Sequence, residues 1–260
     1  MTKKVLAVGA HPDDVEFMMA GTLLALAEAG YEPHIFVVAS GSCGSSVIGK
    51  EELVRTRLKE AQAAAARLGA HFHAPVVDDL EITYNIPLLR KVAAVVRKAQ
   101  PDIVLTHSPD EYMEDHSITS RLAVTAAFSR GMPNFATDPE QAVYDKDTVV
   151  YHCLPYGLRD FMGRSVAPDC YVDISNGLET KTRALACHES QRSWLDTSQG
   201  LDSYLLAMQD MSREVGRLSG HFRMAEGWRF HNYRGFCAEG ANLLAEDLGD
   251  LCIQHGGTRE

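Results

Sequence analysis

The sequence predicts an α/β protein with a Rossmann-like three-layer fold, in which a mostly parallel sheet carries helices on both faces. Two observations support this prediction. Strand-like and helix-like segments alternate through the first half of the chain. The strand-like segments are continuous apolar runs, as expected for parallel strands that are buried on both faces. Right-handed crossovers between such strands produce the layered arrangement.

The elements of the first half follow from local composition. The predicted strands are short apolar or β-branched runs at residues 4–10, 34–39, 72–77 and 102–107. The predicted helices are rich in alanine and leucine, or end at a glycine or before a proline, and cover residues 15–30, 51–68, 88–100 and 117–130. Between them, residues 40–49 form a Gly/Ser-rich loop and residues 108–115 a polar loop.

The second half of the chain is less regular. Residues 148–154 and 171–174 are strand-like, and residues 131–146 read as a loop. Asn176, followed three residues later by Glu179, predicts a capping box for a helix that runs to about residue 191. A further helix is predicted at residues 199–218. The chain shows no repeat and no low-complexity linker, so we expect residues 1–260 to form one domain.

Composition excludes several classes of protein. With 45% hydrophobic and 23% charged residues, the chain has the make-up of a globular protein. Its formal net charge of −10 and its lack of a basic run argue against nucleic-acid binding. No apolar stretch approaches the roughly 18 residues of a membrane helix. The apolar run at residues 5–10 is too short for a signal peptide, so we expect a cytoplasmic protein.

The six cysteines are far apart and form no C-x-x-C pair. This spacing argues against a thiolate zinc site and gives no sign of a disulfide framework. The glycines of the loop at residues 40–49 do not form a G-x-G-x-x-G motif between the first strand and its helix. A dinucleotide site is therefore not expected.

Polar residues follow two of the predicted strands directly, and ligands of parallel sheets lie beyond the carboxyl ends of the strands. After the first strand come His11, Asp13 and Asp14; the other strand ends in or precedes His107, Asp110, Tyr112, Asp115 and His116. Two histidines and one aspartate with an open fourth position form a catalytic zinc set, and a second carboxylate can act as the base. A helix start, with Asp13 as N-cap and Glu16 in the first turn, explains the first cluster equally well.

The segment A-H-P-D-D-V-E at residues 10–16 resembles the A-H-P-D-D-E signature of the LmbE-like (PIG-L) zinc-dependent N-deacetylases. The resemblance extends along most of the chain. Arg57 to Ala61 is similar to the family's R-x-x-E-A helix, and Asp115-His116 to the end of its H-P-D-H motif. Supporting similarities to the Y-V-D-I, H-x-S-Q and Y-A-E-x-F segments lie at residues 171–174, 188–191 and 224–228.

The resemblance implies a zinc-dependent enzyme that removes an acetyl group from an N-acetylglucosamine-type sugar, and a homo-oligomer without a membrane or nucleic-acid partner. It implies that Zn²⁺ is held by His11, Asp14 and His116, and that Asp13 is the general base for the attacking water. It also implies that Arg57 binds substrate. The alternative for Arg57 is a helix pair with Glu60, worth a few tenths of a kcal/mol.

The sequence departs from the family pattern at Met113, which stands where H-P-D-H has its first histidine. A thioether cannot donate a hydrogen bond to an oxyanion. Tyr112, His231 or His221 could replace that donor, with His231 reaching the site through the C-terminal segment or from a neighbouring subunit. Alternatively, the protein is a metal-retaining carbohydrate-binding member with weak or no catalysis. Two further histidines have open roles: His188 reads as structural, and His107 either orients a ligand or satisfies backbone groups.

Overall fold

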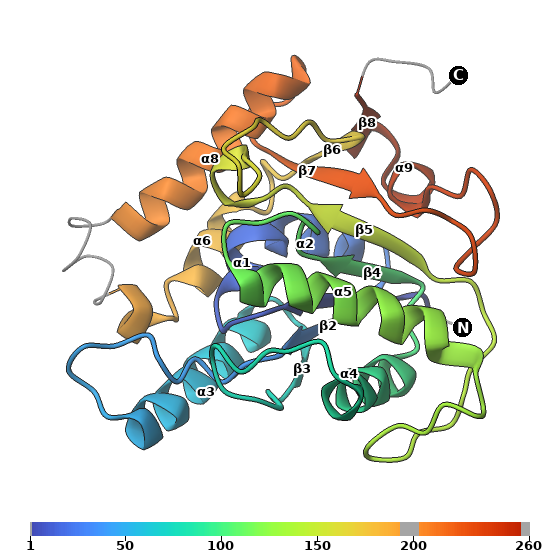
Figure 1. The fold of residues 1–260 in the computed structure, drawn as a ribbon. Coiled ribbons are helices and arrows are strands. Elements are labelled where there is room, and N and C mark those ends of the chain that lie inside the picture. The colour runs from blue at the N-terminus through green and yellow to red at the C-terminus, as the bar shows by residue number, and fades with distance from the viewer. Residues whose placement is uncertain (1, 193–202, 256–260) are drawn as a thin grey trace.

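The computed structural model describes residues 2–192 and 203–255. In these residues eight strands form one mixed sheet, in the order β3-β2-β1-β4-β5-β7-β6-β8 (Figure 1). The strands are β1 (Lys4–Gly9), β2 (Glu32–Val37), β3 (His71–His73), β4 (Ile103–Thr106), β5 (Val149–Cys153), β6 (Cys170–Asp173), β7 (Ala225–Phe230) and β8 (Cys252–Gln254). The first five pair in parallel, whereas β7 is antiparallel to both β5 and β6, and β8 is antiparallel to β6. The predicted Rossmann-like class is confirmed.

Helices cover both faces of this sheet (Figure 1). The α-helices are α1 (Asp14–Met18), α2 (Ala20–Glu28), α3 (Lys50–Arg67), α4 (Ile86–Ala99), α5 (Glu114–Phe128), α6 (Leu178–Leu185), α8 (Ser203–Ser219) and α9 (Leu243–Leu248). Short 3-10 turns are η1 (Ser129–Gly131), η2 (Tyr156–Leu158) and η3 (Gly249–Leu251). No helix in these described ranges combines the length and apolarity that crossing a membrane requires.

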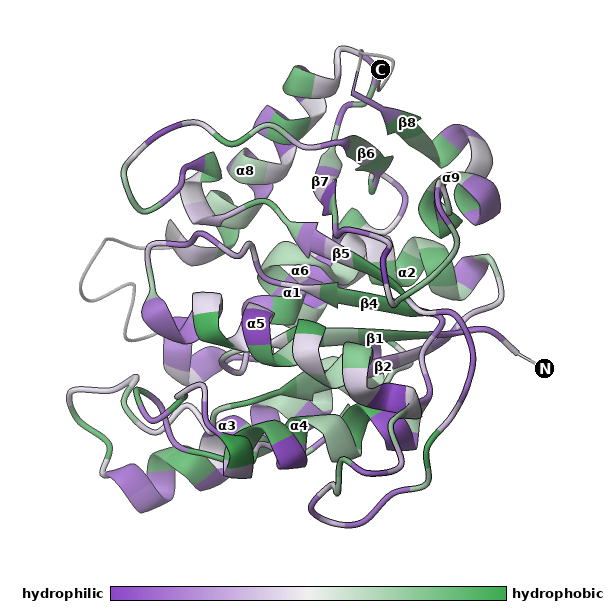
Figure 2. Cartoon of the chain, turned by 45° about the vertical axis from the view of Figure 1, so that its right-hand side comes forward, coloured by the Kyte–Doolittle hydropathy of each residue, from purple (hydrophilic) through white to green (hydrophobic). Residues whose placement is uncertain are grey.

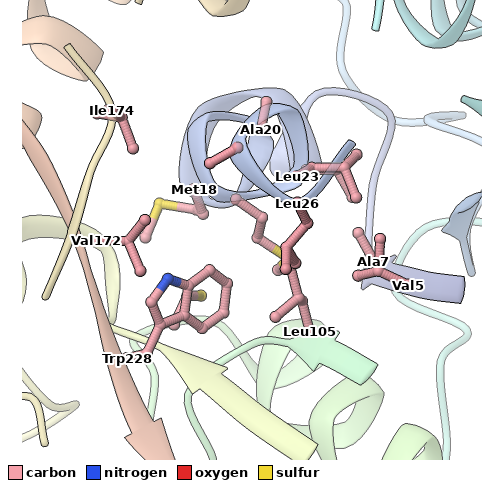
Figure 3. Close-up of a cluster of buried hydrophobic side chains, with 14 of the residues drawn as sticks. Val5, Ala7, Met18, Ala20, Leu23, Leu26, Leu105, Val172, Ile174 and Trp228 are labelled. Atoms are coloured by element: carbon pink, nitrogen blue, oxygen red, sulfur yellow. The ribbon is translucent and has the colours of Figure 1, made fainter. Parts of the chain in front are cut away.

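Alternate residues of the central strands feed two separate cores. Leu6 and Val8 of β1 pack in the core under α4 and α5, whereas Val5 and Ala7 pack in the core under α1 and α2. Figure 2 shows β1 and β4 as hydrophobic strands enclosed by these layers. In the second core, Trp228 is fully buried beside the α1–α2 pair (Figure 3), and its indole N–H donates to Thr22 Oγ1 at 2.8 Å. Each large apolar side chain buried in this way contributes roughly 1.5–3 kcal/mol.

The predicted helix at 15–30 is interrupted at Met19, which separates α1 from α2. A carboxylate from β7 explains the break: Glu226 accepts the N–H groups of Gly21 and Thr22, both at 2.8 Å. Lys181 completes the arrangement with an ion pair to Glu226 at 2.6 Å, and both side chains are almost fully buried. The new helix start is thus capped by a residue two hundred positions away, which local composition does not reveal.

Other boundaries also differ from the prediction. The capping box is wrong: α6 begins at Leu178 after Gly177, without a side-chain cap, and ends at Leu185. The strand predicted at 72–77 is reduced to β3, and the helix predicted at 117–130 begins at Glu114. The helix predicted at 199–218 is confirmed from Ser203, and its first residues lie outside the described part of the chain. The antiparallel strands β7 and β8 were not predicted.

Candidate active site

A cavity of about 460 Å³ lies beyond the carboxyl ends of β1 and β4, lined by residues from the first turns of α1 and α5. This volume is within the range of pockets that bury a drug-sized ligand. The described residues that line it are His11, Asp13, Asp14, Phe17, Met18, Cys43, Gly44, Arg57, Asp79, Leu80, Glu111, Tyr112, Met113, His116, Tyr156, Gln191, Tyr204 and Ala207. His116 enters this wall from the first turn of α5.

The three predicted ligands, His11, Asp14 and His116, converge in the cavity. One ligand atom from each lies within 4.8 Å of the other two. His116 Nε2 is 3.4 Å from Asp14 Oδ1, and His11 Nδ1 is 3.5 Å from Asp14 Oδ2. Two imidazoles and one carboxylate that face open space suit a divalent metal with one position left for water or substrate.

Each of the two candidate ligand histidines has a carboxylate at its other ring nitrogen. Asp115 Oδ2 is 3.0 Å from His11 Nε2 and also accepts the N–H of Leu80 at 2.8 Å. Glu111 Oε2 is in direct contact with His116 Nδ1. Metal-ligating histidines usually donate their second N–H to such a carboxylate, which fixes the tautomer and the ring orientation. These contacts are the structural evidence that the residues present fit a metal ion.

Backbone N–H groups orient the third ligand, because Ala10 and His11 donate to Asp14 Oδ2 at 3.0 and 2.7 Å. His107 Nε2 accepts the Ala10 N–H at 3.0 Å and lies 3.2 Å from the same carboxylate oxygen. His107, Glu111 and His116 also bring ligand atoms within 4.8 Å of one another. However, His107 does not line the cavity and Glu111 touches His116 directly, so this second group reads as support for the first.

The charges around the cavity favour a cation. Burial lowers the pKa of His11, but hydrogen bonds to Asp115 and Asp14 outweigh it and raise that pKa to about 10. Burial also lowers the pKa of His116, but Asp14 and Glu111 outweigh it, so that this pKa is raised. Asp14 is buried too, yet His116 and His107 hold its pKa well below its usual range. The same field that favours protonated imidazoles favours a bound metal ion.

Asp13 occupies an unusual backbone position between two of the ligands. Its φ of 114° lies in the region that non-glycine residues rarely adopt, and its side chain makes no capping bond to α1. Asp13 does stand at the N-cap position of α1, with Glu16 in the first turn, so the predicted helix start is confirmed, but its side chain does not cap the helix. Instead, the Tyr204 hydroxyl donates to Asp13 Oδ2 at 2.6 Å, and Arg57 Nη2 lies 3.5 Å from Oδ1. Strain of this kind persists where surrounding contacts impose it, most often at functional sites.

Arg57, on α3, packs against the Gly/Ser loop at residues 40–49 and lines the cavity there. Its Nη2 donates to the Pro12 carbonyl at 2.5 Å, and a Cβ on Gly41 would lie only 2.5 Å from its Cδ. Gly41 also has a φ of +78°, so both space and conformation require glycine there. Glu60 bonds Ser190 instead of Arg57, at 2.6 Å from the hydroxyl, which makes the predicted helix pair wrong.

The structure separates the candidates for the missing donor. Tyr112 lines the cavity beside Met113, with its ring edge-on to His116 at 5.7 Å between centroids. His231 does not line the cavity; it follows the last residue of β7 and packs beside β5, with its Nδ1 3.0 Å from His152 Nε2. His221 also lies outside the lining, in the turn after α8.

His188 is fully buried, as a structural residue would be, with Nε2 3.5 Å from Glu16 Oε2. Burial lowers the pKa of His188, but the neighbouring Glu16 and Asp13 outweigh it and raise that pKa. Sequence reasoning missed two residues that hold the site, Glu111 and Tyr204. Glu111 could have been noticed as an acidic residue five positions before a predicted ligand. Tyr204 follows residues outside the described ranges and carries no motif.

A Rossmann-like sheet with a His-Asp-His cluster and an adjacent buried carboxylate defines the class of metal-dependent hydrolases. Residues 6–127 match the family described as GlcNAc-PI de-N-acetylase (PIG-L). The chain is also 32% identical over 234 residues to diacetylchitobiose deacetylase of Thermococcus kodakarensis, covering 88% of this chain and 83% of that protein. The chain belongs to the PIG-L family of N-deacetylases, as the sequence resemblance implied.

Solved structures agree with this assignment. The N,N'-diacetylchitobiose deacetylase of Pyrococcus horikoshii superposes with a TM-score of 0.71 at 25% identity, covering 88% of this chain and 84% of that one. The family fold also carries other chemistry. A 4-oxalmesaconate hydratase of Pseudomonas putida is 29% identical over 197 residues, covering 73% of this chain and 74% of that protein.

Proposed function

We propose that this protein is a zinc-dependent hydrolase that removes the N-acetyl group from an N-acetylglucosamine-type sugar or glycoconjugate. The observation that carries the proposal is the convergence of His11, Asp14 and His116 on one cavity, with Asp13 beside them. The names of the relatives support the substrate class, because both deacetylases described above act on an acetylated amino sugar. Of the metals that suit two imidazoles and a carboxylate, zinc is our choice.

Zinc bound by these three residues would lower the pKa of a water molecule and polarise the acyl carbonyl. Asp13 takes the proton of the attacking water as general base and delivers it to the leaving amine. Burial raises the pKa of Asp13, which brings this carboxylate closer to the pH at which a base is most effective. Tyr204 and Arg57 hold the two carboxylate oxygens, so the base is oriented before substrate arrives.

Tyr112 is our proposed donor to the developing oxyanion. It lines the cavity beside Met113, and a phenol keeps its proton at neutral pH, so the donor is present. A donor of this kind is worth about 3–4 kcal/mol in the transition state. His231 enters the proposal only from a neighbouring subunit, in the homo-oligomer that the resemblance implies. Arg57 stays a proposed substrate contact, because it lines the cavity beside Asp13.

The charges of the cavity favour a neutral sugar over the carboxylate-rich substrate that a hydratase relative's name indicates. The described lining contains four carboxylates, from Asp13, Asp14, Asp79 and Glu111, and one guanidinium, from Arg57. Even with the two positive charges of a bound Zn²⁺ and that of Arg57, these four carboxylates leave about one net negative charge, which disfavours a substrate with several carboxylates. An uncharged sugar with hydroxyl groups would instead find acceptors for its O–H donors. The charges thus support hydrolysis of an acetamide on a neutral sugar, which we place in the cytoplasm.

The test is acetate release from N-acetylglucosamine and N,N'-diacetylchitobiose by the zinc-loaded protein. Asp13→Asn should lower turnover by roughly 10²–10⁴, the usual weight of a general base, while zinc content stays at one per chain. Asp110→Asn, an exposed aspartate in the same polar region, is the matched control. Near-normal turnover of Asp13→Asn would remove Asp13 from the mechanism. Sugar binding without acetate release by the wild-type protein would support the non-catalytic alternative.

A further inference from the structure

Four aromatic side chains form a continuous strip along one wall of the cavity. The ring centroids of Tyr204 and Phe17 are 5.8 Å apart, those of Phe17 and Tyr156 are 5.6 Å apart, and those of Tyr156 and Tyr112 are 5.7 Å apart. All four residues line the cavity, although they come from α8, α1, η2 and the loop before α5. We call these residues, Phe17, Tyr112, Tyr156 and Tyr204, the aromatic strip.

The strip changes character from the inside to the mouth. Tyr204 and Phe17 are 7% and 6% exposed, and Tyr204 is committed to Asp13. Tyr156 and Tyr112 are 45% and 57% exposed. The inner pair therefore packs the wall of the cavity, whereas the outer pair offers ring surface at its mouth.

Tyr156 is exposed but held in place. Its backbone N–H donates to Glu111 Oε1 at 2.5 Å, and Glu111 is the buried carboxylate that also contacts the metal ligand His116. Its ring packs against Phe17 and Tyr112, and no described residue hydrogen-bonds its phenol. A positioned ring with a free hydroxyl, next to the reactive site, is suited to bind part of a substrate.

We propose that Tyr156, with the ring of Tyr112, forms a subsite for a second pyranose ring joined to the sugar that carries the reacting acetamide. This inference rests on the proposed deacetylase function. A pyranose has an apolar C–H face and an edge of hydroxyl groups, and a tyrosine matches both with its ring and its phenol. The phenols of these two tyrosines can hydrogen-bond the hydroxyl groups of a sugar, which a lipid chain does not offer, and this favours a sugar as occupant. The preferred substrate is then a disaccharide or longer N-acetylated glycan.

The experiment compares kcat/KM for N,N'-diacetylchitobiose and N-acetylglucosamine in the wild-type protein and in Tyr156→Ala. The variant should lose roughly tenfold more on the disaccharide than on the monosaccharide, mainly through KM. Tyr156→Leu, which keeps apolar bulk without an aromatic face, is a second variant in case alanine disturbs η2. Phe161→Ala is the matched control, because Phe161 is an aromatic residue 64% exposed on the following loop, outside the cavity lining.

Equal losses on both substrates, or no loss on either, would overturn the proposal. The octyl glycoside of N-acetylglucosamine is a third substrate. A loss confined to this substrate would assign the subsite to an apolar aglycone and would also overturn the proposal. Calorimetric binding of chitobiose and glucosamine to the same variants tests the subsite without catalysis. If no acetate is released but Tyr156→Ala still weakens chitobiose binding selectively, the proposed function fails and the subsite stands; if that selectivity is absent too, both fail.

Discussion

Glu111→Gln is the substitution that tests most directly whether the cavity is a metal site. The Glu111 side chain is 2% exposed and contacts His116 Nδ1, on the opposite side of the ring from the nitrogen that faces Asp14. Glutamine keeps the size of the side chain and removes its charge. Replacing the carboxylate behind a metal-ligating histidine typically weakens metal binding by 10–100-fold. We therefore expect the Kd for Zn²⁺ to rise by this factor, which corresponds to about 1.4–2.8 kcal/mol.

The assay is a titration of metal-free protein with Zn²⁺ in competition with a chromophoric chelator at fixed pH. Glu114→Gln is the matched control, since Glu114 lies three residues further along and is exposed. Its Kd should equal that of the wild-type protein. An unchanged Kd in Glu111→Gln, with the fold intact by circular dichroism, would refute the assignment of His116 as a ligand supported by Glu111.

Three other substitutions test separate parts of the structure. Tyr112→Phe should lower turnover by about 10²–10³ without changing zinc content, and near-normal turnover would show that Tyr112 is not the oxyanion donor. Lys181→Met leaves Glu226 buried without its cation, so urea denaturation should show a loss of about 3–5 kcal/mol; a loss below 1 kcal/mol would contradict the role given to this pair. Burial and the neighbouring His34 and Lys98 lower the pKa of His73 from 6.5 to about 4. The unfolded chain therefore binds this proton at a higher pH than the folded chain, and stability should fall as the pH drops from 6.5 towards 4. In His73→Gln the free energy of unfolding should fall by roughly 1–3 kcal/mol less over this pH range than in the wild-type protein. If denaturation shows the same pH dependence of stability in both proteins, this role of His73 is wrong.

The parallel half of the fold could be predicted because its signals are local. Strands β1, β2 and β4 are short runs of buried apolar residues, and the helices between them end at glycine or before proline. The antiparallel half could not be predicted in the same way. Strand β7 contains Glu226, Gly227 and Arg229, and it is a strand because it pairs with both β5 and β6. Such pairing depends on contacts between residues far apart in the chain.

The ligands of the candidate site could be predicted, whereas most of their supports could not. His11 and Asp14 follow a recognisable strand, and His116 stands in a segment that resembles a family motif. Tyr204 donates to Asp13, although the two residues are 191 positions apart in the chain, and no spacing rule connects them. Arg57 shows the same limit. Local spacing indicated Glu60 as its partner, whereas in the fold its guanidinium contacts Pro12 and Asp13.

The two oxygens of Glu111 connect the metal site to the mouth of the cavity, and this connection sharpens the first prediction. One oxygen contacts His116 and the other accepts the N–H of Tyr156. Glutamine has a single acceptor oxygen, so Glu111→Gln can satisfy only one of these donors. If the oxygen stays with Tyr156, the amide N–H₂ faces His116 Nδ1 and favours the tautomer that is protonated at Nε2. That nitrogen faces Asp14 and can no longer bind zinc, so metal affinity falls while the preference for the disaccharide survives. If the oxygen instead stays with His116, the turn at Tyr156 loosens, and the disaccharide preference falls together with the metal affinity that the lost charge supported. Measuring both quantities in the same variant therefore shows which contact determines the position of Glu111.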